Sequence, residues 1–357
     1  MTAHGGYDVL SGADDRPFGA RLVLENGAVF HGRSFGGASA SGGEVVFNTS
    51  MSGYQEALTD PSYTGQILVM TAPEIGNYGV TTEDVESDRI AVSGFVVRQY
   101  SRIRSNHRAQ THLHDYLLAA GVPGIEGVDT RAIVRILRSE GAMRGVIEPD
   151  PTRSDAEILE TLRQVPSMQG CNLAGEVGAR EAGVFTEGLG AWRALSPGVS
   201  GDGLRVIAID CGAKRNIYRN LVDRGCVVDW VPFDIPAADL EAAFQKGDVH
   251  GLFISNGPGD PAAVEATIET LKAVAGTIPT FGICLGHQLL AHSIGAETFK
   301  LKFGHRGANQ PVRNELTGQV EITSQNHGFG VSPDAINDNR DKVDVTHVNL
   351  NDETIEG

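Results

Sequence analysis

The second half of the chain alternates short apolar runs with helical stretches, and this pattern limits the fold more than any other feature. Four runs have the length and apolar character of buried strands: Arg205–Asp210, Cys226–Pro232, Gly251–Ser255 and Pro279–Ile283. Helical stretches follow or separate them: 214–223, 263–275 and 286–294. Such alternation predicts a doubly wound, mostly parallel sheet with helices on both faces. Ligands of these sheets bind beyond the carboxyl ends of the strands.

The most informative turn is Gly282-Ile283-Cys284-Leu285-Gly286, which follows a predicted strand and opens a predicted helix. The pattern G-x-nucleophile-x-G in this context indicates a nucleophile elbow. Its sharp turn needs glycines where neighbouring chain segments approach closely, and the helix N-terminus favours the thiolate form of cysteine. We therefore predict that Cys284 is the nucleophile, with the N–H of Leu285 directed at a developing oxyanion. A free cysteine is more often a small buried apolar residue, and we interpret Cys211 in that way.

A second turn, Ser255-Asn256-Gly257-Pro258-Gly259-Asp260-Pro261, follows the neighbouring strand. Alone it could be an ordinary turn, but beside the elbow it is a natural source of a second oxyanion N–H. The sequence contains no G-x-x-x-x-G-K-[ST] loop and no strand-linked G-x-G-x-x-G. ATP chemistry on this chain is therefore not expected.

The first half of the chain is rich in strand signals. Asn26-Gly27 lies between two apolar runs within 21–32, which predicts a tight hairpin. Further strands are predicted at Glu44–Asn48, Gln66–Thr71 and Ile90–Val97, and a helix at Asp129–Gly141. A Gly-, Ser- and Pro-rich stretch then separates the two halves.

We accordingly predict four regions along the chain: a flexible N-terminus at 1–18, a strand-rich α/β domain at 19–190, a linker at 191–203 and an α/β domain at 204–357.

Charge and cysteine content exclude several classes of protein. The formal net charge is −16 and basic residues are scattered, so a nucleic-acid or acidic-membrane surface is not expected. No apolar stretch is long enough to span a membrane, and no secretory signal is apparent at the N-terminus. The four cysteines are widely spaced without a C-x-x-C pair, which favours reduced thiols in the cytoplasm and predicts no metal site.

Several motifs together carry a family resemblance. Gly282–Gln288 (GICLGHQ) and Ser255–Pro261 (SNGPGDP) resemble the class I, or triad-type, glutamine amidotransferases. Five further segments resemble the small, glutaminase subunits of carbamoyl phosphate synthetases: 48–63 (NTSMSGYQEALTDPSY), 127–131 (GVDTR), 210–217 (DCGAKRNI), 303–311 (FGHRGANQP) and 325–329 (QNHGF). The similarity runs from about Arg21 to Gly357, and the resemblance implies a flavodoxin-like amidotransferase domain after an N-terminal domain that docks a large subunit.

The resemblance also implies roles for individual residues. Cys284 would form a glutamyl thioester, with Leu285 and Gly257 as oxyanion donors. Glutamine would be held by a set of residues from both halves of the chain: Ser50, Gly257, Gly259, Leu285, Gln288, Asn326, Gly328 and Phe329. On spacing alone, Gln288 could equally be a surface residue and Asn326-His327-Gly328 an ordinary turn.

The sequence departs from this family at one motif. In the family, the histidine that acts as general base and the glutamate that orients it lie in a C-terminal G-H-P-E motif. Neither that histidine nor that glutamate is present in this chain. We expect the printed sequence to be a fragment of a longer reading frame that stops before the motif, which the codons after 357 would test. We assign the base role to none of the histidines present; His287, three positions after Cys284, is expected to pack or to face solvent.

The expected function is therefore the glutaminase subunit of a heteromeric carbamoyl phosphate synthetase. It would hydrolyse L-glutamine and pass ammonia to a large subunit that binds ATP and Mg and serves arginine and pyrimidine biosynthesis, while this chain holds no cofactor. The alternative is a base-less, non-catalytic glutamine-binding or docking partner of the synthetase.

Overall fold

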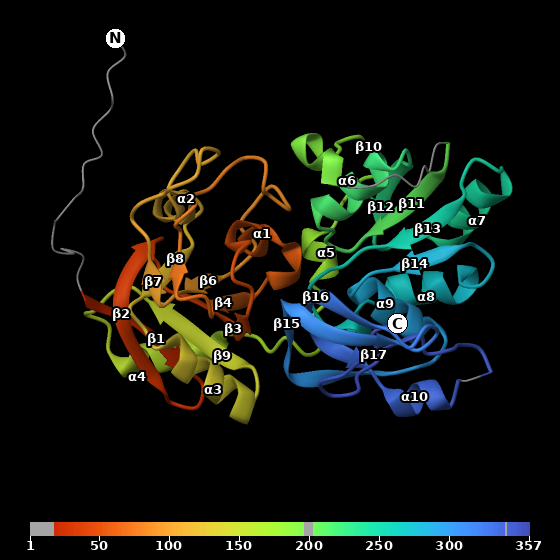
Figure 1. The fold of residues 1–357 in the computed structure, drawn as a ribbon. Helices are drawn as coiled ribbons and strands as arrows, with labels where there is room; N and C mark the ends of the chain where they lie inside the picture. Colours follow the sequence, from red (N-terminus) through yellow and green to blue (C-terminus); the bar gives the residue numbers. More distant parts are fainter. Residues whose placement is uncertain (1–17, 196–202, 340) are drawn as a thin grey trace, which may run out of the picture.

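The computed structural model describes residues 18–195, 203–339 and 341–357. Two domains lie side by side, a strand-rich N-terminal domain and an α/β C-terminal domain (Figure 1). The mixed α/β architecture predicted from the sequence is confirmed. Except for Phe18, the predicted flexible N-terminus lies outside the described residues, as do residues 196–202 of the predicted linker.

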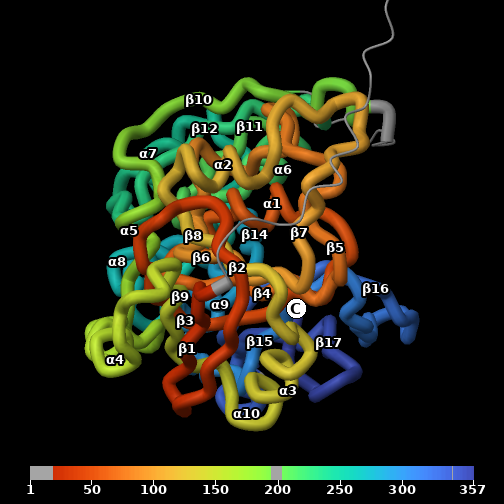
Figure 2. The backbone as a smooth tube through the Cα atoms, turned by 90° about the vertical axis from the view of Figure 1, so that its left-hand side faces the viewer, coloured from red at the N-terminus to blue at the C-terminus, as the bar shows by residue number. Residues whose placement is uncertain are grey.

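The strands of the N-terminal domain close into a barrel in the order β1-β2-β8-β6-β4-β3-β9. These strands are β1 (Phe18–Leu24), β2 (Val29–Gly36), β3 (Ser41–Asn48), β4 (Gln66–Met70), β6 (Gly94–Val96), β8 (Pro123–Glu126) and β9 (Met143–Glu148). The predicted hairpin is present, because β1 and β2 pair up to Val23 and Val29. Its turn is longer than the two residues Asn26-Gly27 expected from the sequence, and of these two only Gly27 has a positive φ, of 88°. Only Gly94–Val96 of the predicted strand at 90–97 is extended and paired. Figure 2 views the molecule from the side of this barrel.

Both faces of the barrel wall are buried. All five residues of β4 are buried, since Ile67 and Val69 point to one core while Leu68 and Met70 point to another. This double burial explains the uninterrupted apolar run in the sequence. Four helices cover the barrel: α1 (Tyr54–Thr59), α2 (Leu113–Ala119), α3 (Thr130–Glu140) and α4 (Asp155–Gln164). The predicted helix cap is confirmed at α3, where the Asp129 side chain accepts a hydrogen bond from the N–H of Ala132.

The C-terminal domain is built on a sheet in the order β10-β12-β11-β13-β14. Its strands are β10 (Gly183–Phe185), β11 (Arg205–Asp210), β12 (Val227–Pro232), β13 (Gly251–Ile254) and β14 (Thr280–Gly282). All neighbours are parallel except β10, which pairs antiparallel with β12. Because β10 belongs to this sheet, the chain enters the C-terminal sheet before residue 190, the predicted end of the first domain.

Helices cover both faces of this sheet, as the alternating pattern predicted. Four helices contribute: α6 (Arg215–Asp223), α7 (Ala237–Gln245), α8 (Glu265–Val274) and α9 (Leu285–Ser293). Tyr218 of α6 packs with Phe253 in one core, whereas Leu271 of α8 and Leu289 of α9 pack with Ile254 in the other. Because β11, β13 and β14 are parallel, their carboxyl ends lie at one edge of the sheet, and the turns that follow them meet there.

A long hairpin stands at the junction of the domains (Figure 1). It is formed by β15 (Thr298–Asn314) and β16 (Val320–Val331), and the short β17 (His347–Asn349) pairs with β15. The N–H of Ala142 donates to the carbonyl of Lys302 at 2.7 Å, and Lys300 forms an ion pair with Glu44 of β3. The hairpin thus joins the barrel to the α/β domain. The remaining elements are short: β5 (Glu74–Ile75), β7 (Gln99–Tyr100), α5 (Ala174–Val177), α10 (Pro333–Asn337), and the 3-10 turns at Pro61–Tyr63, Gly190–Leu195 and Pro261–Ala263.

Candidate active site

Cys284 occupies a strained turn between β14 and α9. Its φ of 53° and ψ of −107° lie outside the backbone regions that non-glycine residues favour. Among the described non-glycine residues, only Glu353 also has a positive φ. Such strain persists only where the surrounding structure imposes it, and it concentrates at functional sites. The predicted strand–turn–helix elbow is therefore present, with α9 beginning at Leu285.

The glycines that flank the elbow are required by close packing. A Cβ atom on Gly282 would lie 2.6 Å from the carbonyl carbon of Gly286, and a Cβ on Gly286 would lie 2.3 Å from the carbonyl oxygen of Ile254. Both obstacles are backbone atoms, which cannot move aside as a flexible side chain can. The G-x-C-x-G pattern therefore follows from the geometry of the turn.

The sulfur of Cys284 donates a hydrogen bond to the carbonyl oxygen of Asn326 at 3.4 Å. Cys284 is partly buried, and desolvation raises the pKa of its thiol to about 12, with the negative charge of Asp60 adding to this shift. The N–H of Leu285 and the charge of Lys214 lower the pKa, but by less. The N–H at the start of α9 therefore acts in the predicted direction, favouring the thiolate, but desolvation of the charged form outweighs it.

The turns after β11 and β13 lie beside the elbow that follows β14. The N–H of Cys211 donates to Ser255 Oγ at 2.9 Å, and the N–H of Ile283 donates to the carbonyl of Ile254 at 3.1 Å. The Leu285 side chain lies against Gly257, so the two residues predicted to supply oxyanion N–H groups are neighbours. Cys211 itself is fully buried in the core, in agreement with the structural role predicted for it.

A small pocket at Cys284 gathers most of the residues that the resemblance implied. Those that line it are Gly257, Gly259, Gln288, Asn326, Gly328 and Phe329. Ser50 lines the adjoining cavity, which shares Asn326 with this pocket. The pocket has further lining residues that were not predicted from the sequence, among them Glu44, Ser62 and Arg306. Ser62 belongs to the same 48–63 motif as Ser50, so the motif carried the signal although its individual residues could not be ranked.

Gln288 ties the elbow helix to the hairpin. Its Nε2 donates a 2.7 Å hydrogen bond to the carbonyl oxygen of Phe329, and the side chain is buried. The interpretation of Gln288 as a surface glutamine is therefore excluded. The hydrogen bond also fixes where β16 lies relative to Cys284.

Asp60 connects the N-terminal domain to the same pocket. Its Oδ2 accepts a 2.9 Å hydrogen bond from Asn326 Nδ2 and lies 3.2 Å from Lys214 Nζ. Asp60 is only 1% exposed, and its charge raises the pKa of Lys214. A buried carboxylate of the barrel domain thus orients an amide of the α/β domain.

Arg306 places a buried positive charge beside the pocket. The residue is 4% exposed, Nη1 donates to the carbonyl of Phe303 at 2.8 Å, and burial lowers the guanidinium pKa. Within the described residues, Nε has no hydrogen-bond partner. A guanidinium in this setting is suited to an anionic group, because a buried charge without a counter-charge is costly.

Two histidines lie close to the elbow. His287 lines a separate apolar cavity beneath α9, and burial lowers its pKa. This placement agrees with the packing role predicted for it. His327 lines the Cys284 pocket, but its ring nitrogens contact the Phe329 carbonyl and the Gln325 amide oxygen.

A cysteine in a strained elbow at the carboxyl edge of a parallel sheet, beside a glycine-rich turn from the neighbouring strand, is the arrangement of a class I glutamine amidotransferase domain. Residues 207–357 match the family described as "Glutamine amidotransferase class-I". Residues 22–147 match "Carbamoyl-phosphate synthase small chain, CPSase domain".

Close relatives extend this similarity over almost the whole chain. The carbamoyl phosphate synthase small chain of Thermosynechococcus vestitus is 51% identical over 96% of this chain and 88% of its own. Those of Methanopyrus kandleri and Syntrophotalea carbinolica are 48% and 49% identical over 95% of this chain, and over 89% and 88% of their own. The chain belongs to the carbamoyl phosphate synthase small chain family. Across its described residues, no helix has the length and apolarity needed to cross a membrane.

Proposed function

We propose that this chain is the glutaminase subunit of a carbamoyl phosphate synthetase, hydrolysing L-glutamine to glutamate and ammonia at Cys284. The observation that carries this proposal is the strained elbow, which presents the thiol to a pocket lined by Gly257, Gln288 and Asn326. Neither the strain nor the close glycine packing is needed by a merely structural cysteine.

The chemistry runs in two stages. The sulfur of Cys284 attacks the amide carbon of the glutamine side chain, and the N–H groups of Leu285 and Gly257 stabilise the oxyanion that forms. The carbon–nitrogen bond breaks, and ammonia leaves with the proton that the thiol has lost. Water then hydrolyses the thioester to glutamate and restores the thiol. Because the pKa of the resting thiol is about 12, the first stage needs a proton acceptor, a role that the resemblance gives to the G-H-P-E motif.

Glutamine carries an α-carboxylate, and the buried guanidinium of Arg306 is a suitable partner for it. Its guanidinium lines the pocket, where Glu44 acts on it without forming a close ion pair, so a bound carboxylate would supply a direct counter-charge. Asp60, through Asn326, holds the opposite wall in place.

The ammonia would pass to a large synthetase chain that binds ATP and Mg, so that no cofactor is required on this chain. The names of the relatives support a small chain that works with a partner. We place the complex in the cytoplasm and its product in arginine and pyrimidine biosynthesis.

The test compares two nitrogen donors in the complex with the large chain. Cys284→Ser should abolish synthesis from glutamine and retain synthesis from ammonia, whereas Cys226→Ser should retain both. Glutamine-dependent synthesis by Cys284→Ser would refute the nucleophile assignment. Binding of glutamine without hydrolysis by the unmodified complex would instead favour the non-catalytic docking partner.

A further inference from the structure

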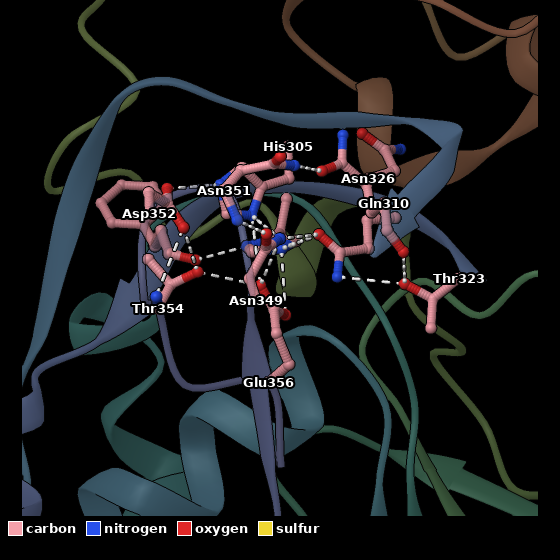
Figure 3. A network of polar contacts seen from close by, with 12 residues as sticks. His305, Gln310, Thr323, Asn326, Asn349, Asn351, Asp352, Thr354 and Glu356 are labelled. Atoms are coloured by element: carbon pink, nitrogen blue, oxygen red, sulfur yellow. Dashed lines mark hydrogen bonds and ion pairs between the residues drawn. The ribbon is translucent and has the colours of Figure 1, made fainter. Parts of the chain in front are cut away.

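Three metal-ligating side chains converge beside the hairpin, and the hydrolytic reaction uses none of them as ligands. His305 of β15, His327 of β16 and Glu356 each offer one ligand atom, and these atoms lie within 4.8 Å of one another. Figure 3 shows the surrounding polar network, with His305 and Glu356 labelled. We propose that they form a binding site for a divalent transition metal ion, with Zn²⁺ as the ion that fits best. The proposal does not depend on glutamine hydrolysis.

Asn349 contributes a donor to this cluster. Its Oδ1 accepts the backbone N–H of Asn351 at 2.9 Å, so its Nδ2 is the donor side. This Nδ2 carries two hydrogens and has three acceptors within reach: Gln325 Oε1 at 3.3 Å, His305 Nδ1 at 3.4 Å and Glu356 Oε1 at 3.5 Å. The amide therefore does not by itself fix the hydrogen positions on the His305 ring.

The Asp352 carboxylate determines where the hydrogen lies on one nitrogen of the His305 ring. Its Nε2 lies 2.7 Å from the carboxylate of Asp352, which can only accept, so Nε2 carries the hydrogen. On a neutral ring its Nδ1 presents a lone pair, and this atom faces Glu356 Oε1 at 3.1 Å.

His327 repeats this arrangement from the facing strand. Its Nδ1 lies 2.8 Å from the carbonyl oxygen of Phe329, so Nδ1 carries the hydrogen. Its Nε2 faces Glu356 Oε2 at 3.4 Å and Gln325 Oε1 at 3.3 Å, both of which are acceptors. If both rings are neutral, two nitrogen lone pairs point at the Glu356 carboxylate with no hydrogen between them.

Such a cluster is stable only with added positive charge. Two imidazole nitrogens and one glutamate make a ligand set that Zn²⁺ commonly accepts, with a fourth position for water. The Asp352 carboxylate and the Phe329 carbonyl hold the far ring nitrogens, as outer partners of metal-binding histidines do. His305 is 6% exposed, so the site is shielded from competing water. The rival to a metal ion is a pair of protons, one on each ring.

The sequence gives no local signal for this site, and no metal site was expected from it. The ligands lie on separate segments with no short repeated spacing, and register alone brings them together, since His305 pairs with His327 across β15 and β16. His327 stands between Asn326 and Gly328, so a bound ion would fix the hairpin segment that lines the Cys284 pocket.

The experiment uses the chain freed of metal by a chelator and then titrated with ZnCl2 against a chromophoric chelator. We expect one Zn²⁺ per chain. His305→Asn and Glu356→Gln should each weaken binding by more than about 100-fold, and Asp352→Asn by about 10–100-fold. The matched controls are His347→Asn on β17 and the exposed Glu353→Gln, which should bind as the unmodified chain does.

Cobalt separates this site from the free thiols of the chain. Co²⁺ at two imidazoles and a carboxylate should give visible absorption without a thiolate charge-transfer band, and Cys284→Ser should leave it unchanged. The milder Asp352→Asn variant keeps the test decisive if a ligand variant fails to fold. If the chain does not bind one Zn²⁺, the proposal is wrong and protons on the two rings balance the carboxylate instead. A thiolate charge-transfer band would also contradict it, as would Zn²⁺ binding that Glu356→Gln does not weaken.

Discussion

Asn326 Nδ2 donates a 2.9 Å hydrogen bond to Asp60 Oδ2, across 266 positions of sequence and between the two domains. The backbone carbonyl of the same Asn326 accepts the hydrogen bond of the Cys284 thiol. Asn326 therefore contacts both the barrel domain and the nucleophile. The N-terminal domain thereby helps to form the Cys284 pocket.

Replacing Asp60 tests this connection. Asp60→Asn removes a charge that pairs with Lys214 and orients Asn326, so we expect the KM for glutamine to rise by about 10–100-fold, the worth of a hydrogen bond to a charged group. Steady-state kinetics of the complex measure this. The control is Asp88→Asn, which removes an exposed ion pair with Arg215 between the same domains and should change little. Equal effects of the two substitutions would contradict the role of Asp60.

The pH dependence of thiol labelling tests the environment of Cys284. Its pKa of about 12 in the folded chain lies above the value of about 8.5 for an unfolded cysteine, so the folded thiol keeps its proton between these two values. Alkylation of Cys284 should therefore rise about tenfold per pH unit from pH 7 to pH 10 without a plateau. The denatured chain should reach its plateau near pH 9. Peptide mapping after iodoacetamide treatment follows this site, and a plateau below pH 8 in the folded chain would show that the thiolate is favoured.

Gly286 is predicted to tolerate no side chain. An added methyl group would meet the carbonyl of Ile254 at 2.3 Å, so Gly286→Ala should lower the free energy of unfolding by about 1–3 kcal/mol. Gly251→Ala on the neighbouring β13 is the control, because its nearest obstacle lies at 3.4 Å. Chemical denaturation compares the two, and equal stability would show that the elbow is not tightly packed.

Arg306 is predicted to bind the substrate carboxylate. Arg306→Met removes a buried charge and fills the space with a neutral side chain, so the fold should persist while the KM for glutamine rises by about 10–100-fold. Ammonia-dependent synthesis should not change. Arg313→Met, on the same strand but in an exposed ion pair with Glu315, is the control. An unaltered KM in Arg306→Met would assign the guanidinium a structural role.

The sequence predicted the α/β domain well because its signals are local. The run Arg205–Asp210 is β11 to the residue, and the glycines around Cys284 identify a turn whose geometry admits nothing larger. The partners of that turn could not be predicted in this way. Arg306, Ser62 and Asp60 reach the pocket from distant segments, and only the packing of the hairpin against the barrel brings them there.

The net shift of the thiol pKa could not be predicted for a related reason. The helix N-terminus is visible in the sequence, whereas desolvation and the neighbouring charge of Asp60 are properties of the tertiary structure. Local sequence therefore predicted a nucleophile without describing its protonation.

The central claim is that Cys284 forms a covalent glutamyl thioester, and acid quenching of the complex during turnover of labelled glutamine tests it most directly. Mass spectrometry of the digested chain should find label on the peptide that contains Cys284, released by mild base and absent from Cys284→Ser. Turnover with no label on that peptide, or label that persists in Cys284→Ser, would contradict the account.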